Sequence, residues 1–79
     1  MNRIEEMFAF VASEDDGEGV AAAQMGNMLM PLVGADAARV DSMRGIAQAI
    51  CNATGRRITL VRFSQREELE VMGPKQGMN

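Results

Sequence analysis

The N-terminal third of the chain alternates between apolar runs and turn residues, a pattern typical of short β-strands joined by hairpins. Residues 7–12 carry apolar side chains on both faces of an extended segment, which predicts a strand covered on two sides. Residues 20–25 and 28–33 are further strand candidates, although three consecutive alanines in the first of them fit a helix equally well. An Asp-Gly pair, which favours a type I′ hairpin turn, and a Gly-Asn pair separate these segments. We therefore expect an antiparallel meander.

The spacing of the apolar residues changes after Gly34 to intervals of three and four. The residues that follow this spacing are Val40, Met43, Ala47, Ile50 and Cys51. The pattern predicts one amphipathic helix from Asp36 to Thr54. Asp36 is a suitable N-terminal cap, and Gly55 stands where helices commonly end in a left-handed residue.

The C-terminal third predicts one more strand and a short helix. Residues 57–63 are rich in β-branched and large apolar residues, as strands are. The run Ser64-Gln65-Arg66-Glu67 matches a capping box, in which the hydroxyl and the carboxylate each accept a hydrogen bond from a free amide at a helix start. We expect this helix to end at Met72, before Gly73-Pro74, and residues 73–79 to form a flexible tail.

These elements predict a single α+β domain over residues 1–79. The expected order is β-β-β-α-β followed by the short helix, with a small antiparallel sheet of three to four strands and the long helix packed on one face. Met7, Ala9 and Val11 would form a second apolar face, which the short helix covers only in part. Because exposed apolar area of this kind is typical of an interface, we expect a two-fold homodimer.

The composition excludes several classes of function. The chain has no histidine, one cysteine and a net charge of −3. The commonest catalytic base and metal ligand is therefore missing, and no phosphate loop, metal motif or catalytic triad is present, so we expect no enzyme, cofactor or metal site. The acidic charge and the absence of Tyr and Trp disfavour direct nucleic-acid binding. A lone cysteine, no membrane-length apolar run and no export leader predict a cytoplasmic protein with no membrane contact.

The charged residues are unevenly distributed along the chain. Residues 1–40 contain seven acidic and two basic residues, whereas residues 41–79 contain four acidic and six basic ones. The candidate partner-binding residues form two acidic groups, Glu14, Asp15, Asp16 and Glu18 at an expected hairpin turn, and Glu67, Glu68 and Glu70 in the expected short helix. Such carboxylates can pair with the Lys and Arg side chains of a protein surface that normally holds nucleic-acid phosphates. Ordinary turn solvation and helix capping are the alternative explanations of the two groups.

Three stretches of the chain, residues 7–12, 34–55 and 60–69, resemble small phage and prophage accessory proteins. Over residues 5–72 the chain looks like small anti-CRISPR proteins directed at type I systems, including the type I-C group. The resemblance implies a non-catalytic inhibitor in the host bacterial cell, which binds the multisubunit Cascade surveillance complex and blocks target DNA binding. The alternative is a phage structural or assembly protein that relies on apolar contacts.

Overall fold

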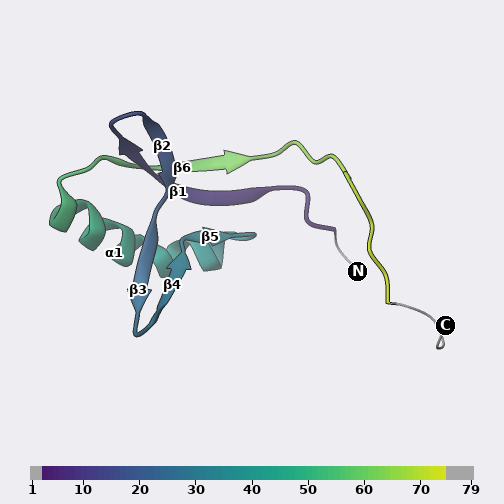
Figure 1. The fold of residues 1–79 in the computed structure, drawn as a ribbon, viewed down its shortest axis with the longest axis horizontal. Helices are drawn as coiled ribbons and strands as arrows, with labels where there is room; N and C mark the ends of the chain where they lie inside the picture. Colours follow the sequence, from purple (N-terminus) through teal and green to yellow (C-terminus); the bar gives the residue numbers. More distant parts are fainter. Residues whose placement is uncertain (1–2, 75–79) are drawn as a thin grey trace.

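A central strand pairs along both of its edges in the computed structural model, which describes residues 3–74 (Figure 1). The elements in chain order are β1 (Met7–Glu14), β2 (Gly17–Val20), β3 (Ala22–Met25), β4 (Met28–Pro31), β5 (Val33–Gly34), α1 (Ala37–Thr54) and β6 (Ile58–Phe63). Strand β6 runs along one edge of β1, while β2 and β5 share the other edge. All these pairs are antiparallel, so β1 holds together a four-stranded antiparallel sheet.

Two short hairpins are closed by two-residue turns. Strands β1 and β2 meet around Asp15-Asp16, and strands β3 and β4 form a separate two-stranded sheet around Gly26-Asn27. Gly26 has a φ of 63°, as expected for glycine at the first central position of a hairpin turn. The type I′ turn expected at the Asp-Gly pair is not formed. Glu14 pairs with Gly17, so both central residues are aspartates, and neither has a positive φ.

The two hairpins and the main sheet meet at a ring of three backbone hydrogen bonds. Phe10 N–H donates to Leu32 O at 3.0 Å, Leu32 N–H donates to Ala21 O at 2.8 Å, and Ala21 N–H donates to Phe10 O at 2.8 Å. Each residue is a donor to one neighbour and an acceptor from the other. All three side chains are buried, which places this junction in the core.

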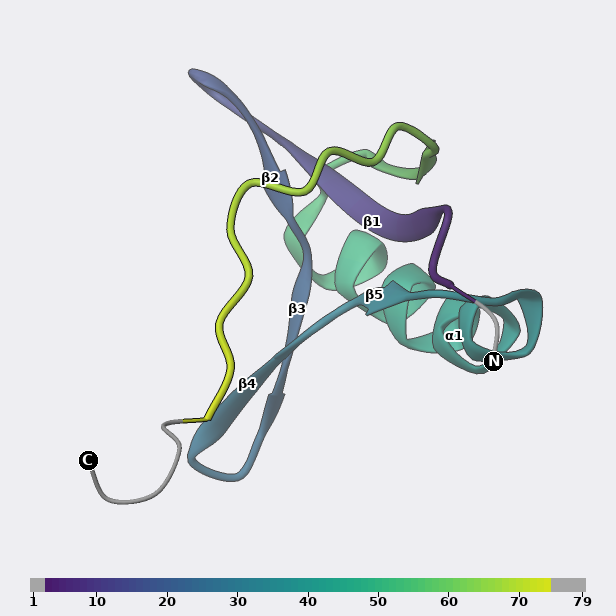
Figure 2. The same cartoon turned by 90° about the vertical axis from the view of Figure 1, so that its right-hand side faces the viewer.

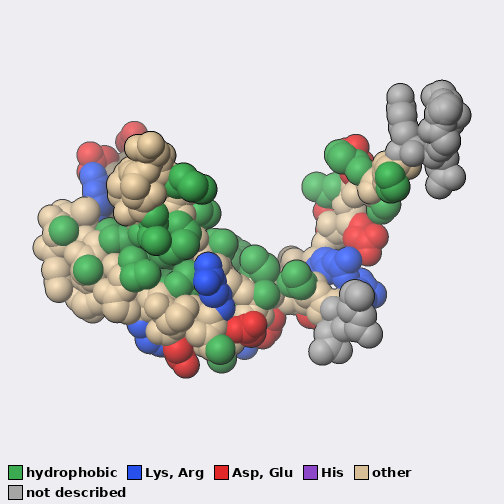
Figure 3. Space-filling view, turned by 90° about the horizontal axis from the view of Figure 1, so that it is seen from below, with side chains coloured by type: hydrophobic (Ala, Val, Ile, Leu, Met, Phe, Trp, Pro, Cys, Tyr) green, Lys and Arg blue, Asp and Glu red, His purple; other side chains and the backbone are tan. Residues whose placement is uncertain are grey.

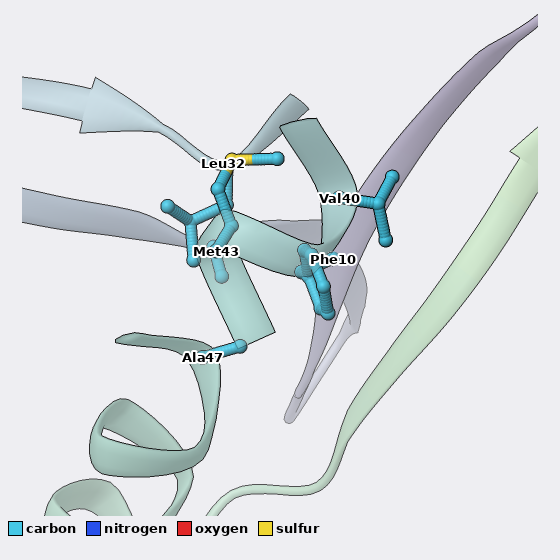
Figure 4. Packing of buried hydrophobic residues seen from close by; sticks show 6 residues of the cluster. Phe10, Leu32, Val40, Met43 and Ala47 are labelled. Carbon is cyan, nitrogen blue, oxygen red and sulfur yellow. The ribbon is translucent and has the colours of Figure 1, made fainter. Parts of the chain in front are cut away.

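Helix α1 covers one face of the main sheet and completes the core. Its N-terminus is capped by Asp36, whose Oδ1 accepts a hydrogen bond from Arg39 N–H at 2.8 Å, and it ends at Gly55 with a φ of 73°. Figure 4 shows its inward residues, Val40, Met43 and Ala47, against the buried side chains of the junction. The expected helix boundaries and both caps are confirmed.

The α+β class, with antiparallel strands and one long helix, is confirmed, but two expected strands are divided. Residues 20–25 and 28–33 each change partner at a junction residue, because Ala21 and Leu32 bond to the ring and not to the ladder on either side. The long β1–β4 meander is therefore two hairpins that share a base. Figure 2 shows their tips diverging from that base, one upward and one downward in the view.

The expected short helix after β6 is wrong. Residues 64–74 contain no helix or strand, and they lead away from the sheet (Figure 1). The apolar residues that were expected to hold the helix against the sheet are unburied, with Leu69 86% and Met72 81% exposed. Without tertiary packing, a helix shorter than about 12 residues is marginal in water, and a capping box alone does not stabilise it. Of the expected flexible tail, residues 75–79 lie outside the described residues.

Among the three junction residues, Leu32 should be the one whose truncation lowers stability most, because its side chain is fully buried. We expect Leu32→Ala to lower the free energy of unfolding by about 2–5 kcal/mol, since it leaves a cavity beside α1. Leu29→Ala is the matched control, because Leu29 lies on the same hairpin but is 66% exposed, and it should change stability by less than about 0.5 kcal/mol. Urea denaturation followed by circular dichroism measures both, and equal losses would contradict a core at the hairpin base.

Two glycines should respond to alanine in opposite directions. A Cβ at Gly34 would lie 2.5 Å from Cγ and 3.0 Å from Cβ of Arg39, so strand β5 and α1 have to move apart. We expect Gly34→Ala to destabilise the fold by about 1–3 kcal/mol. Gly45 lies in the middle of α1 with nothing within 4 Å of an added Cβ, so Gly45→Ala should stabilise by up to about 1 kcal/mol. Thermal unfolding of the two variants should show a lower melting temperature for Gly34→Ala and a higher one for Gly45→Ala than for the unaltered protein.

Candidate functional site

The first acidic group forms the tip of the β1–β2 hairpin. Asp15 and Asp16 are the two turn residues, and Glu14 and Glu18 lie on the strands beside them. All four side chains are exposed. The four acidic residues therefore lie at a hairpin turn, as the sequence predicted. Their role in partner binding stays a prediction.

Glycine shapes the acidic tip. An ideal Cβ at Gly19 would lie 3.0 Å from Oε2 of Glu14, so the Glu14 side chain folds across the space above this glycine. Gly17 has a φ of 145°, a conformation that other residues rarely adopt. Glycine at these two positions leaves room for the Glu14 side chain and for the backbone of the tight turn.

Basic residues contact the β1–β2 hairpin at Ser13, close to its tip, but form no ion pair with the tip carboxylates among residues 3–74. Ser13 N–H donates to Arg57 O at 2.9 Å, and Arg56 Nη1 donates to Ser13 O at 2.9 Å. These bonds tie the start of β6 to the hairpin. Among residues 3–74 the ion pairs join Arg3 and Arg66 to Glu68 and Arg44 to Asp41, and none includes a tip carboxylate. The tip therefore presents negative charge that is free for an outside partner.

The second acidic group lies far from the first. In the antiparallel register Met7 pairs with Phe63, so residues 64–74 leave the sheet at the end of β1 opposite to the hairpin tip. Strand β1 alone spans about 25 Å, and residues 67–70 lie beyond its far end. Glu68 is already paired, with Arg66 Nη2 at 3.1 Å and Arg3 Nη2 at 3.8 Å, while Glu67 and Glu70 are exposed. The structure does not bring the seven predicted residues into one surface.

An apolar counterpart of the acidic tip occurs on the β3–β4 hairpin. Met25, Met28 and Leu29 surround the Gly26-Asn27 turn and are 54%, 71% and 66% exposed. The chain has no charged residue between Val20 and Ala35, which is the sequence signal for this surface. Met30 of the same hairpin packs against the core instead. The strand pattern of the sequence did not predict that Met25, Met28 and Leu29 would be exposed together.

One hollow of the described residues contains the cysteine. A hollow of about 280 Å³ between α1 and β6 is lined by Phe10, Arg44, Ala47, Gln48, Cys51, Ile58 and Leu60. Its lining contains a thiol but no carboxylate that would act as a base, and burial of a cysteine among apolar groups is ordinary packing. Within the described part of the chain, no three Cys, Asp or Glu side chains cluster in a way that would bind a metal ion.

Three comparisons with known proteins found no match. No family model matches the chain, and neither the curated proteins nor the solved structures contain a match. In residues 3–74, α1 is not apolar enough to be a membrane span.

Proposed function

We propose that this protein is a non-catalytic inhibitor that binds a basic surface of a partner protein through the tip of its β1–β2 hairpin. The observation that carries the proposal is that Glu14, Asp15, Asp16 and Glu18 are exposed at a projecting turn and form no ion pair with another residue of 3–74. A hairpin tip only two residues wide can enter a groove that is shaped for a nucleic-acid backbone. Its carboxylates would then meet the Lys and Arg side chains that bind phosphates there.

The target proposed for this tip is the type I Cascade complex. The resemblance to anti-CRISPR proteins suggests this partner, and the acidic tip supplies chemistry that suits a DNA-binding groove. An inhibitor of this kind works by occupancy, so it needs one copy per groove and no turnover. Blocking target DNA would follow from the overlap of the tip with the path of the phosphates.

A second candidate function is a structural or assembly role that relies on apolar contacts. It is favoured by the β3–β4 hairpin, whose Met25, Met28 and Leu29 are exposed on an arm without charge. Methionine side chains adapt to irregular partner surfaces, which suits a contact of this kind. The first candidate function uses the β1–β2 hairpin and the second uses the β3–β4 hairpin, so substitutions in one hairpin at a time distinguish them.

Reversing the charge of the acidic tip should weaken partner binding. We expect Asp15→Lys with Asp16→Lys to raise the Kd for Cascade at least tenfold, mainly through slower association, because the tip carboxylates are exposed. Binding of the unaltered protein should also weaken as salt rises, since exposed charge pairs are screened. Surface plasmon resonance with immobilised Cascade measures both effects.

The matched control for the tip is Glu67→Lys with Glu70→Lys, which makes the same change in net charge at the other end of β1. This variant should bind within about threefold of the unaltered protein. If the two double variants lose affinity equally, net charge and not the tip governs binding. If the unaltered protein does not bind Cascade, the proposed target is wrong.

The apolar alternative has its own variant. Met28→Gln with Leu29→Glu should leave Cascade binding unchanged under the first proposal, because both side chains lie on the hairpin that points away from the acidic tip (Figure 2). Recovery of virion proteins from a phage-infected lysate by the unaltered protein, and its loss in this variant, would favour the assembly role. Quantitative mass spectrometry of the recovered proteins distinguishes the two results.

A further inference from the structure

The face of the main sheet that points away from α1 is mainly apolar between Met7 and Val11 of β1. Residues that lie opposite each other in an antiparallel pair share a face, so the ladder partners of Met7, Ala9 and Val11 define this surface. We call it the open face, and it consists of Met7, Ala9, Val11, Val20, Val33, Thr59, Val61 and Phe63. None of these side chains belongs to the cluster that packs against α1.

The outer part of the open face is exposed. Val20 is 52%, Phe63 54% and Met7 37% exposed, while Ala9 and Val11 in the middle are buried between the flanking strands. The three exposed residues present on the order of 300 Å² of apolar surface. The short helix that the sequence predicted as a partial cover does not form.

The segment after β6 carries the rest of the uncovered apolar surface. Leu69, Val71 and Met72 are 86%, 83% and 81% exposed, and Figure 3 shows hydrophobic side chains uncovered on the arm that leaves the body. They add roughly 400 Å², which brings the total close to the ~800 Å² that each partner contributes to a standard interface. The radius of gyration, 16.2 Å, also exceeds the ~12 Å of a compact chain of this length.

The charges at one end of the open face are self-complementary. Glu18 lies opposite Ser13 on the β2 side, and Arg57 lies opposite Ser13 on the β6 side, where its carbonyl accepts the Ser13 N–H. A two-fold axis along β1 places the β2 edge of one copy over the β6 edge of the other. Glu18 of each copy then faces Arg57 of the second copy, twice per dimer.

We propose that a second copy of this chain covers the open face, related by a two-fold axis parallel to β1. In this arrangement both C-terminal segments leave from the same end of the dimer. Each segment reaches the other copy's hollow of about 500 Å³, which is lined in part by Ile4, Met7 and Phe63. Asp15 and Asp16 lie in the hairpin turn and stay exposed in the dimer, whereas Glu18 is engaged by Arg57 of the second copy. The contacts of the open face do not rest on the proposed inhibitory function.

Light scattering at 10–500 μM gives the first test. The chain has a mass of 8.6 kDa, so we expect about twice this value at the upper concentrations, and a constant 8.6 kDa would overturn the proposal. Phe63→Glu and Val20→Glu should each restore the monomer, since a charge in a packed apolar face opposes association. Leu29→Glu is the matched control, because it introduces the same charge on the exposed β3–β4 tip and should leave the dimer intact. A dimer that persists in both face variants, or dissociates in the control, would place the interface elsewhere.

Charge exchange tests the direction of the axis. Glu18→Arg and Arg57→Glu should each raise the dimer Kd about tenfold, since each change affects two symmetry-related pairs, and the double variant should return to within about threefold. Asp41→Arg and Arg44→Glu make the same changes of charge on the exposed surface of α1, away from the open face, and neither should alter the Kd. A double variant that is no better than the single ones would overturn the axis along β1.

Discussion

The closed ring of backbone hydrogen bonds among Phe10, Ala21 and Leu32 is the interaction on which the rest of the structure depends. In a regular β-ladder, successive backbone amides bond to the same neighbouring strand. Here three segments meet at one point, and each donates a backbone hydrogen bond to the next. Because buried backbone groups need partners, the ring allows the chain to change from one sheet to another inside the core. The three residues are spaced eleven apart, so two hairpins of equal arm length connect them.

That geometry explains how a small domain presents two different surfaces. The β1–β2 hairpin carries aspartates at its turn and the β3–β4 hairpin carries methionines and a leucine, yet both start from the same rigid base. Their tips are remote from the core, so their side chains can serve recognition without an effect on packing. Residues at the base have the opposite role, since Leu32 has no exposed surface and touches nothing outside the protein.

The sequence alone determined the elements that depend on local chemistry. The helix from Ala37 to Thr54 follows from an apolar period of three and four, and both ends follow from caps whose bonds lie within four residues. Strand β6 follows from its β-branched residues, and the acidic tip follows from a turn that collects aspartates. The apolar β3–β4 tip did not follow from the strand pattern, because exposure of Met25 and Leu29 depends on the direction in which that hairpin leaves the core.

The tertiary structure decided what depends on contacts between distant residues. Ala21 and Leu32 interrupt their strands because they bond across the junction, which no local pattern encodes. The expected helix after β6 does not form, although the sequence contains a capping box. Leu69 and Met72 are exposed and do not pack against the sheet, and a helix this short is not stable in water without packing. The two acidic groups lie apart because β1 separates them, a consequence of strand register and not of sequence distance.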